Sequence, residues 1–162
     1  MMRRVASVLI AAGALIAAPA LYAQANRPRA EVTPVVATAQ PKAGAPLALS
    51  LKVVLPKDVH VQANKPRDPS LIPTVLTLTT PDGVKVDEIS YPAPSELAQK
   101  DRKETLAVLG PEFSIEIMAT LAAGVAAGEL KIPAVLRYQA CNDSVCFAPT
   151  RANAEWVVQV SR

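Results

Sequence analysis

The chain has 162 residues, of which 51% are apolar and 19% are charged, and this composition is typical of one globular domain. Its 15 scattered prolines exclude a large helical bundle, because each proline removes an amide donor and obstructs the preceding helical turn. Without Arg3 and Arg4, 15 basic residues (17 − 2) face 14 acidic ones, and this near-neutral charge, together with only 4% aromatic residues, argues against nucleic acid as a partner.

Residues 1–25 are typical of a secretory signal peptide. Arg3 and Arg4 form a positive start, and residues 5–18 form an apolar run of about 14 residues, shorter than the roughly 20 that span a bilayer. We expect cleavage after Ala25, or after Ala23, and a soluble periplasmic or secreted protein; an uncleaved membrane anchor is the alternative. Residues 26–31 are expected to form a loose leader, and the folded domain is expected to extend over residues 32–162.

Alternation of apolar and polar residues with a period of two predicts strands along most of the mature chain. The clearest run is 47–55, where every second residue is apolar and a proline stands on either side. The other predicted strands are 32–38, 58–62, 75–79, 84–89, 113–121, 130–140 and 156–160. Residues 81–83, Pro-Asp-Gly, predict a tight turn between two of them. We therefore predict an all-β fold, an immunoglobulin-like antiparallel β-sandwich of seven to eight short strands.

The polar and charged stretch at residues 92–104 interrupts this pattern. It predicts either a helix of one or two turns or a long exposed loop. Long loops inside compact domains are often functional, although a plain solvated connection fits the composition as well.

Cys141 and Cys146 are the only cysteines, and export would place them in an oxidising compartment where disulfides persist. The residues between them, Asn142, Asp143 and Ser144 first, favour a turn, so the pair is expected to bracket a turn between two strands. A disulfide closing so short a loop stabilises by about 2 kcal/mol in the chain-entropy model, against about 4.7 for a 100-residue loop. Because local, exposed disulfides are more often exchangeable, the spacing favours redox exchange. A purely structural disulfide is the alternative.

His60 is the only histidine of the chain. Two thiolates with Asp143 or His60 would suit zinc or copper(I), but a structural zinc site takes four ligands and the chain has no obvious fourth. We therefore predict no metal ligand set and no cofactor, and we interpret His60 as a hydrogen-bonded residue at the rim of a strand. A serine or cysteine triad would depend on this one imidazole, and no nucleophile elbow, phosphate loop or dinucleotide motif occurs.

The segment 137–150, Arg-Tyr-Gln-Ala-Cys followed after four residues by Cys-Phe-Ala-Pro-Thr, resembles the N-terminal periplasmic domain of the thiol:disulfide interchange protein DsbD. Residues 60–66 and 71–74 resemble that family's early strands, and residues 89–92 resemble its central Tyr-Pro segment. The resemblance covers about residues 32–160. It implies an immunoglobulin-like β-sandwich, in agreement with the alternation.

The resemblance also implies a relay of electrons through the cysteine pair. In this family the pair is reduced by a thioredoxin-like domain, or by a membrane thiol reductase, and then reduces periplasmic disulfide isomerases or cytochrome c maturation factors. The second cysteine usually forms the mixed disulfide, which gives that role to Cys146 and the resolving role to Cys141. The alternatives are a secreted β-sandwich binding module with a structural disulfide, and a copper- or metal-handling protein.

Two further residues are candidates for supporting the pair. A carboxylate at Asp143 would raise the pKa of a nearby thiol, unless it is a plain turn residue. Tyr138 is expected on the inward face of its strand, where it serves either packing or the site. By position, residues 95–104 would form the cap that shields the cysteines in this family.

The chain departs from the family pattern in three places. Four residues separate the cysteines, Ala148 stands where a proline is common, and the expected cap has no aromatic residue. The family's membrane and thioredoxin-like domains are not among these residues, so either separate proteins supply them or the domain has another role.

Overall fold

The computed structural model describes residues 27–99 and 104–162, so the expected signal peptide lies outside the described residues. The described residues form strands and no helix, and each ladder between these strands is antiparallel. The strands are β1 (Glu31–Val36), β2 (Pro46–Val54), β3 (His60–Gln62), β4 (Val75–Leu78), β5 (Val84–Ser90), β6 (Ser95–Leu97), β7 (Leu106–Leu109), β8 (Glu112–Leu121), β9 (Gly128–Tyr138), β10 (Ala140–Cys141) and β11 (Thr150–Val160).

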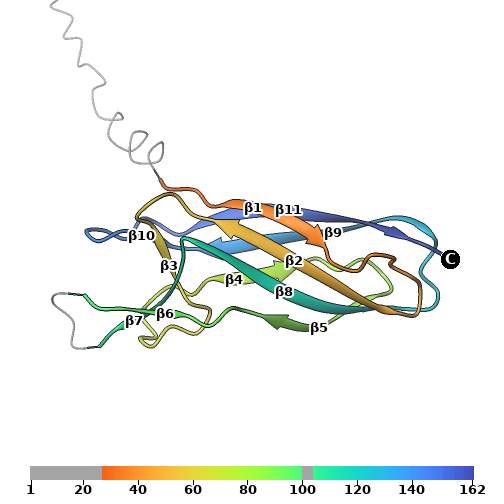
Figure 1. The fold of residues 1–162 in the computed structure, drawn as a ribbon, viewed down its shortest axis with the longest axis horizontal. Coiled ribbons are helices and arrows are strands. Elements are labelled where there is room, and N and C mark those ends of the chain that lie inside the picture. Colours follow the sequence, from red (N-terminus) through yellow and green to blue (C-terminus); the bar gives the residue numbers. More distant parts are fainter. Residues whose placement is uncertain (1–26, 100–103) are drawn as a thin grey trace, which may run out of the picture.

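The strands form two long sheets and one short sheet. The first long sheet has the order β1-β2-β8-β5, and the second has the order β11-β9-β4. These two sheets pack face to face, and the short sheet β10-β3-β7-β6, called the end sheet below, lies at one end of the sandwich (Figure 1). The predicted all-β, immunoglobulin-like sandwich is therefore confirmed.

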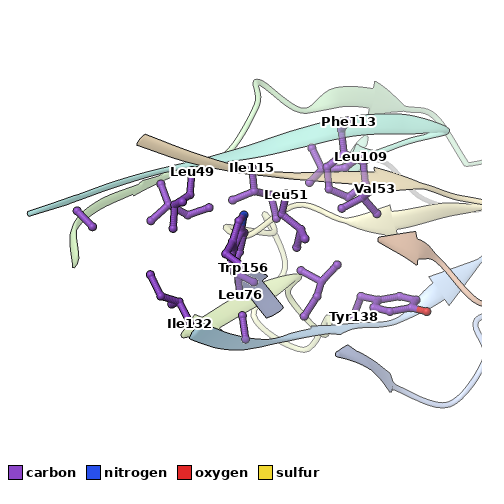
Figure 2. Packing of buried hydrophobic residues seen from close by; sticks show 14 of the residues in the cluster. Leu49, Leu51, Val53, Leu76, Leu109, Phe113, Ile115, Ile132, Tyr138 and Trp156 are labelled. Carbon is purple, nitrogen blue, oxygen red and sulfur yellow. The ribbon is translucent and has the colours of Figure 1, made fainter. Parts of the chain in front are cut away.

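The core fills the space between the two long sheets, as Figure 2 shows for side chains from β2, β8, β9 and β11. Trp156 on β11 lies at its centre with 1% of its surface exposed. Its indole Nε1 donates to the carbonyl oxygens of Val35 and Ser50, at 3.1 and 3.0 Å, and so connects β11 to the opposite sheet. Alternation places these apolar residues on inner faces because successive side chains of a strand point to opposite sides.

The structure differs from the sequence prediction mainly around the end sheet. Leu106–Leu109 is a strand that alternation did not predict, because all four of its residues are buried and no polar residue marks an outer face. Residues 95–97 are strand β6, so the prediction of a short helix or a loop at this position is wrong. The last strand begins at Thr150 rather than Trp156, and eleven strands replace the predicted seven to eight.

The turn predicted at Pro81, Asp82 and Gly83 is confirmed. Val84 N donates to Pro81 O at 3.1 Å, and Gly83 adopts φ = +81°, a conformation that disfavours a side chain. This turn does not close a hairpin, since β4 and β5 belong to different long sheets.

Candidate functional site

A disulfide joins Cys141 and Cys146 in a hairpin that projects from the end of the sandwich (Figure 1). The two residues lie directly opposite each other in an isolated antiparallel bridge, with Cα atoms 4.0 Å apart. Two backbone hydrogen bonds flank the bridge: Phe147 N to Ala140 O at 2.9 Å, and Asn142 N to Val145 O at 3.0 Å. This is the pattern of a non-hydrogen-bonded antiparallel pair, the position at which opposite side chains come closest.

The side chain of Asn142 stabilises the turn between the cysteines. Asn142 Oδ1 accepts hydrogen bonds from the backbone N–H groups of Ser144 and Val145, both at 2.9 Å. An asparagine that bonds to the backbone two residues ahead forms an Asx turn, which is the chemistry that this segment predicts. Behind the hairpin, Gln139 Nε2 donates to Phe147 O at 2.9 Å and ties the returning chain to the base of the loop.

The two cysteines differ in their exposure to solvent. Cys141 is 0% exposed, whereas Cys146 is exposed, and the neighbouring Val145 is exposed as well. Phe147, which follows, packs partly against the hydrophobic core. The hairpin therefore presents one half of the disulfide to the outside and keeps the other half inside.

His60 lies beside the buried cysteine. In the β3–β10 ladder Cys141 pairs with His60, so His60, Cys141 and Cys146 form one row across three adjacent chain segments. Residues that face each other across an antiparallel pair project their side chains from the same face, with Cβ atoms about 4.5–5.5 Å apart. The imidazole is therefore on the side of the sheet that carries the disulfide.

The environment of His60 favours a neutral imidazole. Burial lowers its pKa from the usual 6.5, and the carboxylate of Asp143 in the hairpin turn acts in the opposite direction with a smaller effect. Its Nε2 atom is shielded from solvent and has no hydrogen-bond partner. The prediction that His60 is a hydrogen-bonded rim residue is therefore wrong for this nitrogen.

Gln62 is a second unpartnered polar residue on β3. It is 1% exposed, and neither Oε1 nor Nε2 of its amide has a hydrogen-bond partner. Gln62 and His60 share one face of the strand, while Val61 between them faces the core. Within residues 27–99 and 104–162, these are the two residues whose buried side-chain nitrogen or oxygen atoms lack a partner. Buried polar atoms without a partner are uncommon in folded proteins. The two residues therefore mark the face around the disulfide as a candidate functional surface.

The other predicted site residues lie in different surroundings. Asp143 is exposed in the hairpin turn, where its charge acts on His60. Tyr138 is buried in the core, and its hydroxyl accepts a hydrogen bond from Ala30 N at 2.7 Å. The expected cap begins in β6, which is the edge of the end sheet farthest from β10, and its residues 100–103 lie outside the described residues.

Sequence analysis thus missed Gln62 and underestimated His60. The signal was present in the alternation, because His60 and Gln62 are polar residues on the same face of a predicted strand. The pairing of β3 with β10 was not predictable from that pattern, and only this pairing brings His60 next to Cys141.

Two searches within the described residues returned nothing. No group of three or more His, Cys, Asp or Glu side chains among them is arranged to hold a metal ion. No helix in this part of the chain is long and apolar enough to cross a membrane.

Comparison with protein families is decisive, because the model for the N-terminal part of the thiol:disulfide interchange protein DsbD matches residues 29–156. The chain belongs to the DsbD N-terminal family. The resemblance inferred from the cysteine segment is confirmed by this match. Family membership and the disulfide hairpin together support thiol–disulfide exchange as the activity of the DsbD N-terminal-like domain.

Two solved structures are similar at low identity. The reduced N-terminal domain of DsbD from Neisseria meningitidis is 15% identical, with 79% of this chain and 85% of that chain covered and a TM-score of 0.49. The GAE domain of GGA2p from Saccharomyces cerevisiae is 9% identical, with 80% and 88% covered and a TM-score of 0.43. A comparison with curated proteins finds no match.

Proposed function

We propose that this domain is an exported thiol–disulfide exchange module, in which the Cys141–Cys146 pair relays electrons from a thioredoxin-like domain or membrane thiol reductase to exported thiol proteins. The observation that carries the proposal is the asymmetry of the hairpin disulfide, with Cys146 exposed and Cys141 buried. A relay needs one sulfur that a partner can reach and a second sulfur, close by, that resolves the mixed disulfide. The Cα separation of 4.0 Å keeps the second sulfur within reach of the first.

The chemistry of one transfer involves two electrons. A thiolate of the electron donor attacks the Cys146 sulfur, the Cys141–Cys146 bond breaks, and the Cys141 sulfur leaves with the bonding electrons and takes up a proton. A second thiol of the donor then attacks the donor's own sulfur in the mixed disulfide, which leaves the donor oxidised and both cysteines of the domain reduced. The same steps in reverse, with Cys146 as the nucleophile and Cys141 as the resolving thiol, reduce a disulfide of the acceptor.

The sequence of residues 1–25 supports export, because its charge, apolar run and small-residue end are those of a signal peptide. Export would bring the domain into the periplasm or outside the cell, among proteins that carry disulfides. In the family that the chain resembles, the acceptors are disulfide isomerases and cytochrome c maturation factors. We extend this acceptor class to the present domain.

Trapping with single-cysteine variants tests the assignment of the two sulfurs. Cys141→Ala leaves Cys146 able to form a mixed disulfide that no internal thiol resolves, so it should accumulate a complex with a thioredoxin-like partner that lacks its own resolving cysteine. Cys146→Ala, the matched control, should trap far less because Cys141 is buried. Non-reducing gels measure the complex, and trapping mainly through Cys141 would overturn the assignment.

The reduction potential distinguishes a relay from a structural staple. An exchangeable pair should have a potential above about −300 mV, whereas structural disulfides of secreted proteins typically lie below it. Equilibration with glutathione or thioredoxin buffers, followed by alkylation and mass measurement, gives the value. A pair that resists reduction in both buffers would favour the binding module with a structural disulfide.

A further inference from the structure

The buried position of Cys141 raises a proton problem for exchange. When the disulfide opens, the Cys141 sulfur leaves as a thiolate in a place where it is 0% exposed. A charged sulfur without water is unfavourable, so burial favours the protonated thiol. In the opposite direction the same sulfur has to lose its proton before it can act as a nucleophile.

His60 is the titratable group next to this sulfur. It faces Cys141 across the β3–β10 ladder, and its Nε2 atom is buried without a partner. On the other side of His60 lies Gly110, where a Cβ would come to 3.4 Å from the His60 Cα. Within the described residues, Asp143 in the hairpin turn is the charged group whose field reaches His60, and Gln62 on the same face is uncharged.

On the basis of the proposed exchange function, we propose that His60 is the proton donor and acceptor for the Cys141 sulfur. During reduction of an acceptor, Cys146 is held in a mixed disulfide and His60 Nε2 takes the proton of the Cys141 thiol. The Cys141 thiolate then forms the bond to the Cys146 sulfur, the bond from Cys146 to the acceptor breaks, and the acceptor sulfur leaves with the bonding electrons. During reduction of the domain the transfer runs in the opposite sense: His60 takes up a proton from solvent and passes it to the departing Cys141 sulfur.

The electrostatic surroundings suit this cycle. A free, neutral Nε2 is the form that accepts a proton, and burial keeps the ring in that form by lowering its pKa. Once the ring is protonated, the nearby carboxylate of Asp143 stabilises the imidazolium. The hairpin and β3 thus bring together a nucleophile, a base beside it and a carboxylate that acts on the base, a combination that activates cysteines in other proteins.

Ellman's reagent separates the two steps of exchange in the reduced domain. Attack by Cys146 releases a first coloured thiolate, and attack by Cys141 on the resulting mixed disulfide releases a second. In His60→Gln, which keeps a polar side chain but cannot titrate, the second phase should slow by about tenfold or more and lose the pH dependence of the imidazole. The first phase should change little, and Gln62→Leu, on the same strand face, should leave both phases close to wild type.

The outcomes of this experiment are distinguishable. A second phase of His60→Gln that keeps the wild-type rate and pH profile would overturn the role of His60, with the exchange function intact. Failure of wild-type Cys146 and Cys141 to react in two phases would instead count against the proposed function itself.

Proton NMR gives a second test that does not depend on a His60 variant. Because His60 is the only histidine, the C2 proton of its ring is identified without assignment experiments. Coupling to Cys141 should give this signal two titration steps in the reduced protein and in Cys146→Ala, the second where the Cys141 thiol ionises. Oxidised protein and Cys141→Ala should show one step, and a single step in all four samples would overturn the proposal.

Discussion

The body of the sandwich and the end sheet are built in different ways. In the body, β9 and β11 pair over eleven positions and β2 and β8 over nine, whereas β3 pairs over two positions with each neighbour. Trp156 in the body has two hydrogen-bond acceptors for its one donor, while His60 and Gln62 in the end sheet leave buried atoms unpartnered. The body thus provides stability, and the end sheet keeps polar groups available beside the disulfide. Departures from ideal packing of this kind are often found at functional sites.

Among substitutions that test this difference, the largest loss of unfolding free energy should come from the body. Trp156→Ala should lower the free energy of unfolding by about 3–5 kcal/mol, because it empties the space between the long sheets and removes the hydrogen bonds from the indole to two carbonyl oxygens. Val157→Ala is the matched control, since this next residue is 45% exposed on the outer face and should cost no more than about 0.5 kcal/mol. Urea unfolding measures both, and equal losses would contradict a core centred on Trp156.

The same contrast explains how much of the fold could be predicted from sequence. Strands of the body have one inner and one outer face, so alternation located β2 and β8 to within a residue at either end. Leu106–Leu109 is covered on both faces, and β6 and β10 are only three and two residues long, too short for a pattern. Apart from β3, which lies within the predicted strand 58–62, the strands of the end sheet escaped prediction for a physical reason, namely that period-two alternation needs length and one exposed face.

The candidate site was predictable in the same uneven manner. The cysteines and the Asx turn between them are local in sequence, so their hairpin followed from residue types alone. The neighbour of Cys141 is not local, because His60 reaches it through a pairing between distant segments. For Asp143 the sequence left two alternatives, a carboxylate that raises the pKa of a thiol and a plain turn residue; the structure adds that its charge acts on His60.

Removal of the disulfide should have a smaller effect than loss of Trp156. The bond closes a loop of six residues, so Cys141→Ala combined with Cys146→Ala should cost no more than about 2 kcal/mol of unfolding free energy. The turn also keeps its own hydrogen bonds through Asn142. Urea unfolding of the double variant checks the value, and global unfolding at room temperature would show that the end sheet supports the body after all.

Replacing a buried polar side chain by an apolar one should change the unfolding free energy in opposite directions in the two regions. Gln62→Leu should raise the unfolding free energy by about 1 kcal/mol, because the buried amide it removes has no partner. Ser50→Ala in the body should lower it by about 1 kcal/mol, since Ser50 Oγ donates to Glu116 Oε1 at 2.9 Å. Denaturant unfolding of both variants compares the signs, and a loss of stability in Gln62→Leu would mean that the amide is partnered in solution.

The smallest effect should be the part of the pH dependence of the unfolding free energy that arises from His60. Its pKa in the folded protein lies below the usual 6.5, so between these two values the unfolded chain binds a proton that the folded chain does not. The contribution of His60 to stability is therefore fully present above pH 6.5 and is lost as the pH falls through its folded pKa. His60→Gln should remove this part of the acid sensitivity, as measured by unfolding of both proteins across that pH range. Asp143→Asn should enlarge it, because the carboxylate raises the pKa of His60 and its removal would lower that pKa further. If the three proteins lose stability in parallel as the pH falls, His60 is not held neutral beside the disulfide, and the contrast between the satisfied body and the unsatisfied end sheet loses its electrostatic part.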